Sequence, residues 1–389
     1  MKTIGKVGIF VQNTLWIGQV LRYDTKRQCF VSGSVTVSGG RITALDAPAP
    51  ADAERIDGAG QYLMPGLVDV HTHGRIGFDF DSADEKQMKK MYRSYVSDGT
   101  TTVIPTIASA PFSQMLQALE RIRACGCFPA AHLEGRYLSP KRRGAHRVDL
   151  LANPDIDELH TLLEHITPLP LHITLAPELP GANEFIREAL RLGVTVSMGH
   201  SDATYEQAQT AFANGINAAT HLCNAMAPLH HRAPGNICAA LCDDHIYTEL
   251  ICDGLHVHPG MVQMIHKLKP SDRLVLITDS MSATRCADGN YSIAGMPVVV
   301  KDGKALTVDG ALAGSTITLL DGLKHLMDFC HIPLEQALPC ATINPARMLG
   351  LDQEIGSIEV GKQANFLLCK DNFSDMQVIL NGQRVTTDA

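Results

Sequence analysis

The chain has 389 residues, of which 45% are hydrophobic and 19% are charged. This composition supplies a large core and excludes a disordered protein. The formal charge is −8, and the basic residues are scattered except at 141–143, which excludes the broad positive surface that nucleic acids bind.

The two ends of the chain share one style of sequence. Residues 1–60 contain short strand-like runs punctuated by glycine, such as GSVTVSGGRITAL, and the last residues repeat the style in GSIEVGKQANFLLC and MQVILNGQRV. We expect residues 1–60 and 350–389 to form one small β-sandwich domain together.

The middle of the chain alternates short apolar, β-branched runs with amphipathic segments, which predicts βαβ units and a parallel sheet. The amphipathic candidates include 114–123, 156–164 and 184–192. Eight runs are predicted as strands: GLVDVHTHG, TTVIPTI, AAHLEG, LHITLAPE, VTVSMGH, AATHLCN, TELICDG and RLVLITDS. Eight strands fit a closed α/β barrel, so we predict a (β/α)8 TIM-like barrel over residues 61–349, with a hairpin at 291–308 that turns at Asp302-Gly303.

The first predicted barrel strand ends in His71-Thr72-His73. Side chains two residues apart on a strand point to the same face, so this pair can hold one ion. Alone the pair is a weak signal, because histidine is also an ordinary surface residue.

Four other predicted strands end in the same kind of residue: Glu134, His200, His221 and Asp279. In barrel enzymes the active site lies at that end of the strands. A carboxylate with several imidazoles suits a divalent metal, with zinc first and iron, cobalt or manganese as alternatives. Asp279 is the candidate general base beside that metal, although alone it reads equally well as a cap of the following turn.

Several motifs across nearly the whole chain resemble the N-acetylglucosamine-6-phosphate deacetylases of the amidohydrolase superfamily. They are MPGLVDVHTHG at 64–74, AHLEG at 131–135, GAH at 144–146, GHSDAT at 199–204, THLCNAM at 220–226, HHRAPG at 230–235, DGLHVHP at 253–259, TDSM at 278–281, LAGS at 312–315, NPAR at 344–347 and GSIEVGKQANFLL at 356–368.

The resemblance implies a role for each matching residue. Glu134, His200 and His221 are the ligands of the principal metal, and Asp279 is the general base and then the general acid. The pair His71 and His73 allows a second ion that shares Glu134, so one or two metals per subunit remain open. The implied substrate-binding residues are Ala145, His146, Asn224, Ala225, Arg232, His256, Leu312, Ala313 and Gly314.

The implied substrate is N-acetyl-D-glucosamine 6-phosphate, which hydrolysis of its linear amide converts to D-glucosamine 6-phosphate and acetate. A phosphate needs a cation and hydrogen-bond donors, which Arg232 and His256 offer. The resemblance also implies a homodimer whose sites are completed across the interface.

Three departures from the family pattern, Ala233, Ser280 and Arg285, flank the predicted sugar loops and leave the hexosamine epimer open. One alternative is therefore deacetylation of N-acetyl-D-galactosamine 6-phosphate. Another is a different amidohydrolase acting on an unphosphorylated amide, since the fold hosts many chemistries. Glu134 stands where such enzymes often carry a modified lysine.

Other patterns bear on the compartment. Eleven cysteines at irregular spacing predict reduced thiols, and the chain starts without a basic, apolar leader. No apolar run approaches the roughly 18 residues of a membrane span. We therefore expect a cytoplasmic enzyme that has no membrane partner.

Overall fold

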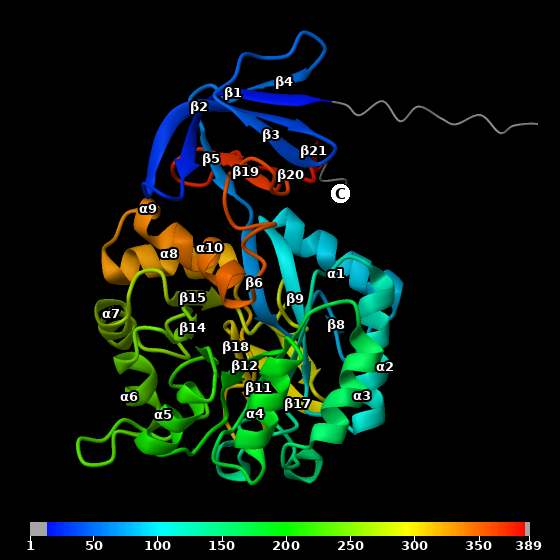
Figure 1. The fold of residues 1–389 in the computed structure, drawn as a ribbon, viewed down its shortest axis with the longest axis vertical. Helices are drawn as coiled ribbons and strands as arrows, with labels where there is room; N and C mark the ends of the chain where they lie inside the picture. Colours follow the sequence, from blue (N-terminus) through cyan, green and yellow to red (C-terminus); the bar gives the residue numbers. More distant parts are fainter. Residues whose placement is uncertain (1–13, 386–389) are drawn as a thin grey trace, which may run out of the picture. The chain divides into compact units, whose positions relative to one another are not determined.

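The computed structural model describes residues 14–385 and divides the chain into two units (Figure 1). One unit comprises the residues up to Gly66 together with those from Gln353 onward, and the other is Leu67–Asp352. Residues 1–13 and 386–389 are part of the predicted terminal domain and lie outside the described residues. The prediction that the chain starts without a leader concerns residues 1–13 and so falls outside the described residues as well.

The larger unit is a barrel of eight parallel strands, as the alternating sequence predicts. In barrel order the strands are β6 (Leu67–Thr72), β9 (Thr100–Ala108), β10 (Ala131–Glu134), β11 (Leu171–Leu175), β12 (Thr195–Met198), β13 (Ala218–Ala219), β14 (Tyr247–Ile251) and β15 (Leu274–Ile277). The barrel closes just beyond β15, where Asp279 N donates to His71 O at 2.9 Å and His73 N donates to Ser280 O at 2.8 Å. The predicted barrel is therefore confirmed.

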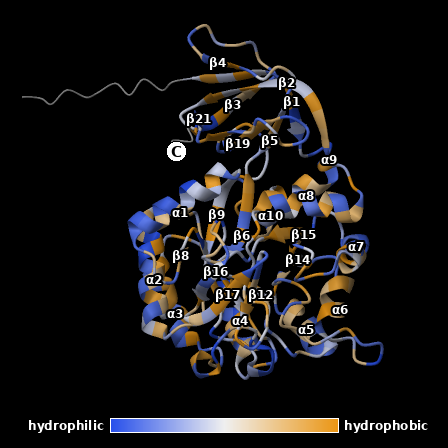
Figure 2. Cartoon of the chain, turned by 180° about the vertical axis from the view of Figure 1, so that it is seen from behind, coloured by the Kyte–Doolittle hydropathy of each residue, from blue (hydrophilic) through white to orange (hydrophobic). Residues whose placement is uncertain are grey.

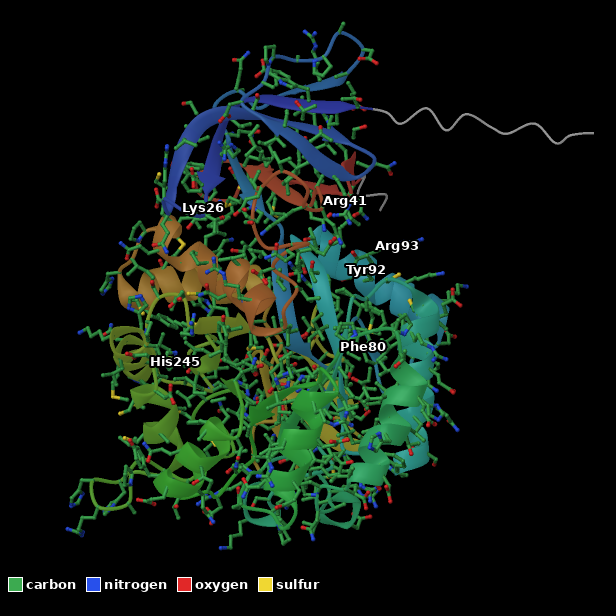
Figure 3. All side chains as sticks on the ribbon, viewed as in Figure 1. Lys26, Arg41, Phe80, Tyr92, Arg93 and His245 are labelled. Atoms are coloured by element: carbon green, nitrogen blue, oxygen red, sulfur yellow. The ribbon has the colours of Figure 1, made fainter. Side chains whose placement is uncertain are left out.

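Helices cover the outside of the barrel with their apolar faces turned inward (Figure 2). They are α1 (Glu85–Ser97), α2 (Phe112–Cys125), α3 (Ile156–Ile166), α4 (Ala182–Arg191), α5 (Tyr205–Ala213), α6 (Gly235–Cys242), α7 (Pro259–Leu268), α8 (Leu319–Cys330), α9 (Leu334–Ala337) and α10 (Ile343–Met348). The three predicted amphipathic segments lie in α2, α3 and α4. Tyr92, labelled in Figure 3, anchors α1 to the sheet because its hydroxyl donates to Thr101 O at 3.0 Å.

Short strands and 3-10 turns lie in the loops between these strands and helices. The predicted hairpin is a three-stranded antiparallel sheet of β16 (Gly289–Ile293), β17 (Met296–Lys301) and β18 (Lys304–Thr307). Asp302 and Gly303, at the second turn, have φ of 52° and 73°, which a type I′ turn requires. The remaining elements are β7 (Gly74–Arg75), β8 (Phe78–Asp79) and the 3-10 turns Pro140–Arg142, Val148–Leu150 and Leu338–Ala341.

The smaller unit is one eight-stranded, mostly antiparallel sheet that curls around its own core. The chain ends contribute β1 (Leu15–Asp24), β2 (Cys29–Ser38), β3 (Arg41–Leu45), β4 (Glu54–Asp57), β5 (Tyr62–Pro65), β19 (Phe366–Cys369), β20 (Gln377–Leu380) and β21 (Gln383–Arg384). Because β19 lies beside β5, the two ends share one sheet, as predicted. Ile17, Leu63 and Phe366 are fully buried in its core.

Among the residues that the structure describes, no helix combines the length and the apolar character that crossing a bilayer requires.

Candidate metal centre and active site

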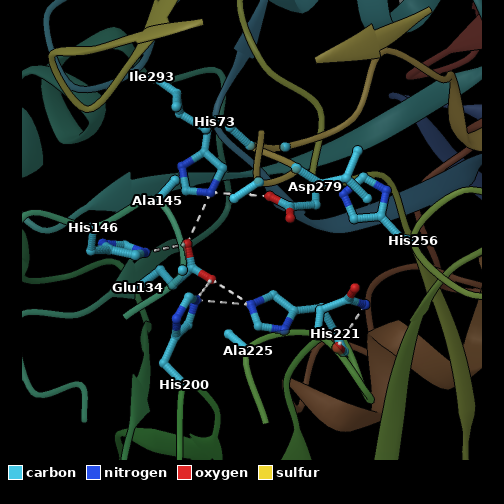
Figure 4. Close-up of a pocket in the computed structure, with 16 residues that line it drawn as sticks. His73, Glu134, Ala145, His146, His200, His221, Ala225, His256, Asp279 and Ile293 are labelled. Atoms are coloured by element: carbon cyan, nitrogen blue, oxygen red, sulfur yellow. Dashed lines mark hydrogen bonds and ion pairs between the residues drawn. The ribbon is translucent and has the colours of Figure 1, made fainter. Parts of the chain in front are cut away.

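Six titratable side chains converge at the carboxyl end of the barrel, and Figure 4 labels all of them except His71. His71 lies on β6 and Glu134 ends β10, whereas His73, His200, His221 and Asp279 directly follow β6, β12, β13 and β15. In a closed barrel these strand ends form one rim, which is why residues up to 208 positions apart meet here. Within the described range, these six residues form two groups whose ligand atoms lie close enough together to hold one ion each.

The first group consists of Glu134, His200 and His221, all buried. Glu134 Oε1 lies 3.1 Å from His200 Nε2 and 2.8 Å from His221 Nε2, and the two ring nitrogens are 3.1 Å apart. Three atoms that can each offer a lone pair therefore face one point, which is the arrangement of a metal site.

The second group consists of His71, His73 and Asp279. His73 Nε2 lies 3.2 Å from Asp279 Oδ1 and 3.1 Å from Glu134 Oε2. Glu134 thus faces both groups, and the two groups are adjacent. This second group is the set of side chains that a second ion sharing Glu134 would need.

The backbone that presents these ligands lies in a rarely populated region. His200, His221 and Asp279 have φ of 47°, 29° and 48°, although none is glycine. Such conformations cost about 1–3 kcal/mol each and cluster at functional sites. The sharp turn after the strand aims each side chain into the barrel mouth.

Charge is the dominant feature of the pocket. Burial lowers the pKa of His73, but hydrogen bonds to Asp279 and Glu134 outweigh it and raise the pKa to about 10. Burial raises the pKa of Glu134, but His71 and the other imidazoles around it hold the pKa well below its ordinary value. Positive charge close by therefore stabilises the carboxylates, and a bound cation would supply it.

The residues fit a divalent cation. His71 Nε2 faces Glu134 and Asp279 at 3.5 and 3.6 Å, yet it has no hydrogen-bond partner among the described residues. A cation between these atoms would use that lone pair and replace the protons on the imidazoles. Four imidazoles and two carboxylates form the borderline ligand set that suits zinc, iron, cobalt or manganese.

Contacts behind the ligands fix the orientation of their rings. His200 Nδ1 donates to the backbone oxygen of Arg142 at 2.9 Å, which leaves Nε2 free to face Glu134. Gly144 lies against the same ring, because a Cβ there would meet His200 Cε1 at 3.0 Å and φ is +55°. Sequence reading did not single out these two supports.

His146 also points into the pocket, and its tautomer follows from its neighbours. The backbone N–H of Ser109 lies 3.3 Å from His146 Nδ1, so Nδ1 is an acceptor and Nε2 carries the proton. Burial lowers the pKa of His146 to about 4. The ring is thus a neutral donor that points Nε2 towards Glu134 Oε2 at 3.4 Å.

The ligands open onto a cavity of about 270 Å³. Its lining includes eight of the nine predicted substrate residues: Ala145, His146, Asn224, Ala225, His256, Leu312, Ala313 and Gly314. Gly144, Ile293 and Ala311 line it as well and were not predicted. Ile293 lies on β16, in the three-stranded sheet of β16, β17 and β18. The alternating sequence pattern there predicts a hairpin, but it does not predict which face of the hairpin lines a cavity.

His256 lines this cavity and is held by a carboxylate behind it. Its Nδ1 lies 2.6 Å from Asp253 Oδ2, and although burial lowers the pKa of His256, this contact raises it above its ordinary value. An imidazole oriented in this way offers its other ring nitrogen, Nε2, to a polar ligand.

Arg232 is the predicted substrate residue that does not line the cavity of its own chain. It is exposed in the loop before α6. The three departures from the family pattern lie outside the lining too: Ala233 is exposed, Ser280 bonds Thr72 at 2.7 Å, and Arg285 pairs with Asp98.

Comparisons with known proteins identify the family of the chain. The model of the amidohydrolase family matches residues 62–385. N-acetylglucosamine-6-phosphate deacetylase of Vibrio furnissii is 38% identical over 83% of this chain and 82% of its own, and N-acetylgalactosamine-6-phosphate deacetylase of Escherichia coli O157:H7 is 34% identical over 89% and 93%.

Solved structures are similar over almost the full length. The N-acetylglucosamine-6-phosphate deacetylase of Pasteurella multocida has a TM-score of 0.90 at 31% identity and covers 96% of this chain and 100% of its own. A variant of the Mycobacterium smegmatis enzyme in complex with N-acetyl-D-glucosamine-6-phosphate has a TM-score of 0.88 at 30% identity, covering 97% and 100%.

Proposed function

The chain belongs to the N-acetylglucosamine-6-phosphate deacetylase family of the amidohydrolases, and we propose that it hydrolyses N-acetyl-D-glucosamine 6-phosphate to D-glucosamine 6-phosphate and acetate. One observation carries this assignment: five of the six ligand-type side chains line one small cavity together with His146, namely His73, Glu134, His200, His221 and Asp279. Such a constellation serves hydrolysis of a polar bond by an activated water.

The chain's own groups divide the chemistry among them. A divalent metal, when bound by Glu134, His200 and His221, supplies a Lewis acid for the acetamide carbonyl and lowers the pKa of water. Asp279 accepts the proton of the attacking water and returns it to the departing amine. His146 donates from Nε2 to the carbonyl oxygen, where negative charge develops.

We assign zinc as the metal, with His71 and His73 able to hold a second ion beside the first. The cytoplasm is the proposed compartment, because all cysteines in the described range are free and a reducing environment keeps thiols so. Amino sugar metabolism is the role that follows from the substrate.

Arg232 is proposed to bind the 6-phosphate of a substrate held by the second subunit of a homodimer. Its guanidinium is exposed and outside its own cavity, so a neighbouring copy is the site that it can complete. Replacement by methionine should reduce kcat/KM for the phosphorylated sugar about 10–100-fold, since hydrogen bonds to charged groups contribute about 1.5–3 kcal/mol. Steady-state kinetics checks this.

Arg187→Met is the matched control for that experiment, because Arg187 is an exposed arginine on α4 whose side chain contacts Glu184 and Asn214 and does not line the cavity. It should leave kcat/KM unchanged. If Arg232→Met reduced kcat/KM equally for phosphorylated and unphosphorylated sugars, Arg232 would not be the residue that binds the phosphate.

The galactosamine epimer is the second candidate substrate. The Escherichia coli O157:H7 relative, at 34% identity over 89% of the chain, is named for N-acetylgalactosamine 6-phosphate. Ser280 and Arg285 do not line the cavity, so these two departures give no reason to prefer the galactosamine epimer.

Acetate release from metal-analysed protein tests the proposed function. We expect the two 6-phosphates to be preferred over the unphosphorylated sugars by at least about 100-fold, because the phosphate adds charged contacts to the transition state. The preferred epimer identifies the substrate. Activity restricted to unphosphorylated amides would contradict the proposal and favour another amidohydrolase chemistry.

A further inference from the structure

Glu249 is a buried carboxylate inside the barrel that belongs to neither ligand group. It lies on β14, is fully buried, and does not line the substrate cavity. Burying a carboxylate is costly unless strong partners compensate it. Its partners therefore indicate what it does.

A single oxygen of Glu249 contacts both ligand groups. Oε2 lies 3.1 Å from His71 Nδ1 and accepts from the backbone N–H of His221 at 3.3 Å. The other oxygen, Oε1, has no hydrogen-bond partner among the described residues. The carboxylate is thus kept in the barrel for these two contacts.

The contact with His71 sets the tautomer of that ring. A carboxylate acceptor at Nδ1 places the proton there, which leaves the Nε2 lone pair free. Nε2 is the atom that faces Glu134 at 3.5 Å and Asp279 at 3.6 Å. Without Glu249, no acceptor fixes the proton on Nδ1 or the orientation of the His71 ring.

The contact with His221 supports a strained turn. His221 has φ of 29°, and its N–H is held by Glu249 Oε2 while Leu222 N donates to the backbone oxygen of Glu249 at 2.8 Å. The same residue therefore fixes the backbone that presents a ligand of the other group.

We propose that Glu249 is a positioning residue that holds His71 and His221 in register, so that the two ligand groups bind their ions as one centre. The proposal rests on the metal-dependent function proposed above. It adds a residue on β14, between the strands that precede His221 and Asp279, and this residue touches neither substrate nor ion.

The test is metal retention in purified holoenzyme dialysed against graded concentrations of a chelator, with zinc counted per chain. Glu249→Met removes the acceptor and should weaken retention about 10–100-fold, the range for loss of an outer-shell partner. Glu249→Gln keeps an acceptor oxygen without the charge and should fall between that variant and the wild type.

Two comparisons separate positioning from a general loss of stability. Thr248→Val alters the adjacent residue on β14, which is equally buried and whose hydroxyl is also unpaired, and it should retain zinc like the wild type. Removing the acceptor of two buried N–H groups lowers stability by itself, so Tm of fully chelated Glu249→Met is measured beside that of fully chelated wild type. A cooperative transition that stays above the dialysis temperature separates weaker metal binding from unfolding.

A double variant tests the route of the effect. If Glu249 acts through His71, adding Glu249→Met to His71→Ala should cost little further retention of the ion that His71 holds. Retention in Glu249→Met within about threefold of the wild type would overturn the proposal, since outer-shell losses exceed that. Unchanged zinc content in His71→Ala would overturn it as well. Acetate release is measured separately from zinc content. The zinc measurement therefore tests the role of Glu249 even if the proposed substrate is wrong.

Discussion

Replacing Glu134 with glutamine should abolish deacetylation and metal retention together. Its oxygens lie within 3.5 Å of five imidazoles, with Oε1 facing His71, His200 and His221 and Oε2 facing His73 and His146. Glutamine removes the negative charge and turns one oxygen into an N–H donor that points at ring nitrogens. Both ligand groups lose their shared member.

The expected size follows from breaking a buried, charged contact. Such losses are about 3–5 kcal/mol, which corresponds to a decrease of about 10²–10⁴-fold in kcat/KM. Steady-state kinetics and metal analysis of the purified variant measure the two effects.

Thermal unfolding adds an independent reading of the same variant. A bound ion stabilises the fold by mass action, so a chelator should lower Tm in the wild type and leave Tm of Glu134→Gln almost unchanged. Glu158→Gln is the control, because Glu158 bonds the Tyr137 hydroxyl at 2.9 Å, away from the ligand groups. Full zinc content in Glu134→Gln would contradict the assignment of Glu134 as the shared ligand.

The metal centre was accessible to sequence reading because barrel topology brings strand ends together. Each ligand follows an apolar run, so counting eight runs was enough to predict that His71, Glu134 and Asp279 meet. Side-chain type then indicated the chemistry. No long-range distance had to be known.

The supporting residues were not accessible in this way. Ser109, Glu249 and Ile293 act through partners far along the chain, and their own neighbours in sequence carry no signal. Glu249 in particular lies within a strand, where alternation predicts only that it points inwards. The positive φ of His200 and His221 was equally hidden, since neither is a glycine.

The terminal unit shows a different limit. The run GSIEVG looks like a strand, yet residues 356–361 form none, and Ile358 instead packs into the core of the curled sheet. A buried apolar residue satisfies the hydrophobic pattern without joining the ladder. The residues that join β5 begin at Phe366.

Replacing Asp279 with asparagine should reduce kcat by about 10²–10⁴-fold, the range for loss of a general acid–base group. Asp279 lines the cavity, and the amide of asparagine can neither take the proton of the attacking water nor return one to the amine. The ion held by Glu134, His200 and His221 should stay bound, because Asp279 is not a member of that ligand group. Near-wild-type turnover would sink this role.

Asp253→Asn is the contrasting variant, because Asp253 is also a carboxylate just beyond a barrel strand but contacts the cavity only through His256. We expect it to raise KM while kcat stays within about tenfold, since an interaction made equally in ground and transition states changes KM alone. A different effect of the two variants on kcat assigns the proton transfer to Asp279. Both variants remove one negative charge from the same rim of the barrel. Only the loss of Asp279 leaves bound substrate without a group that can carry the proton from water to the amine.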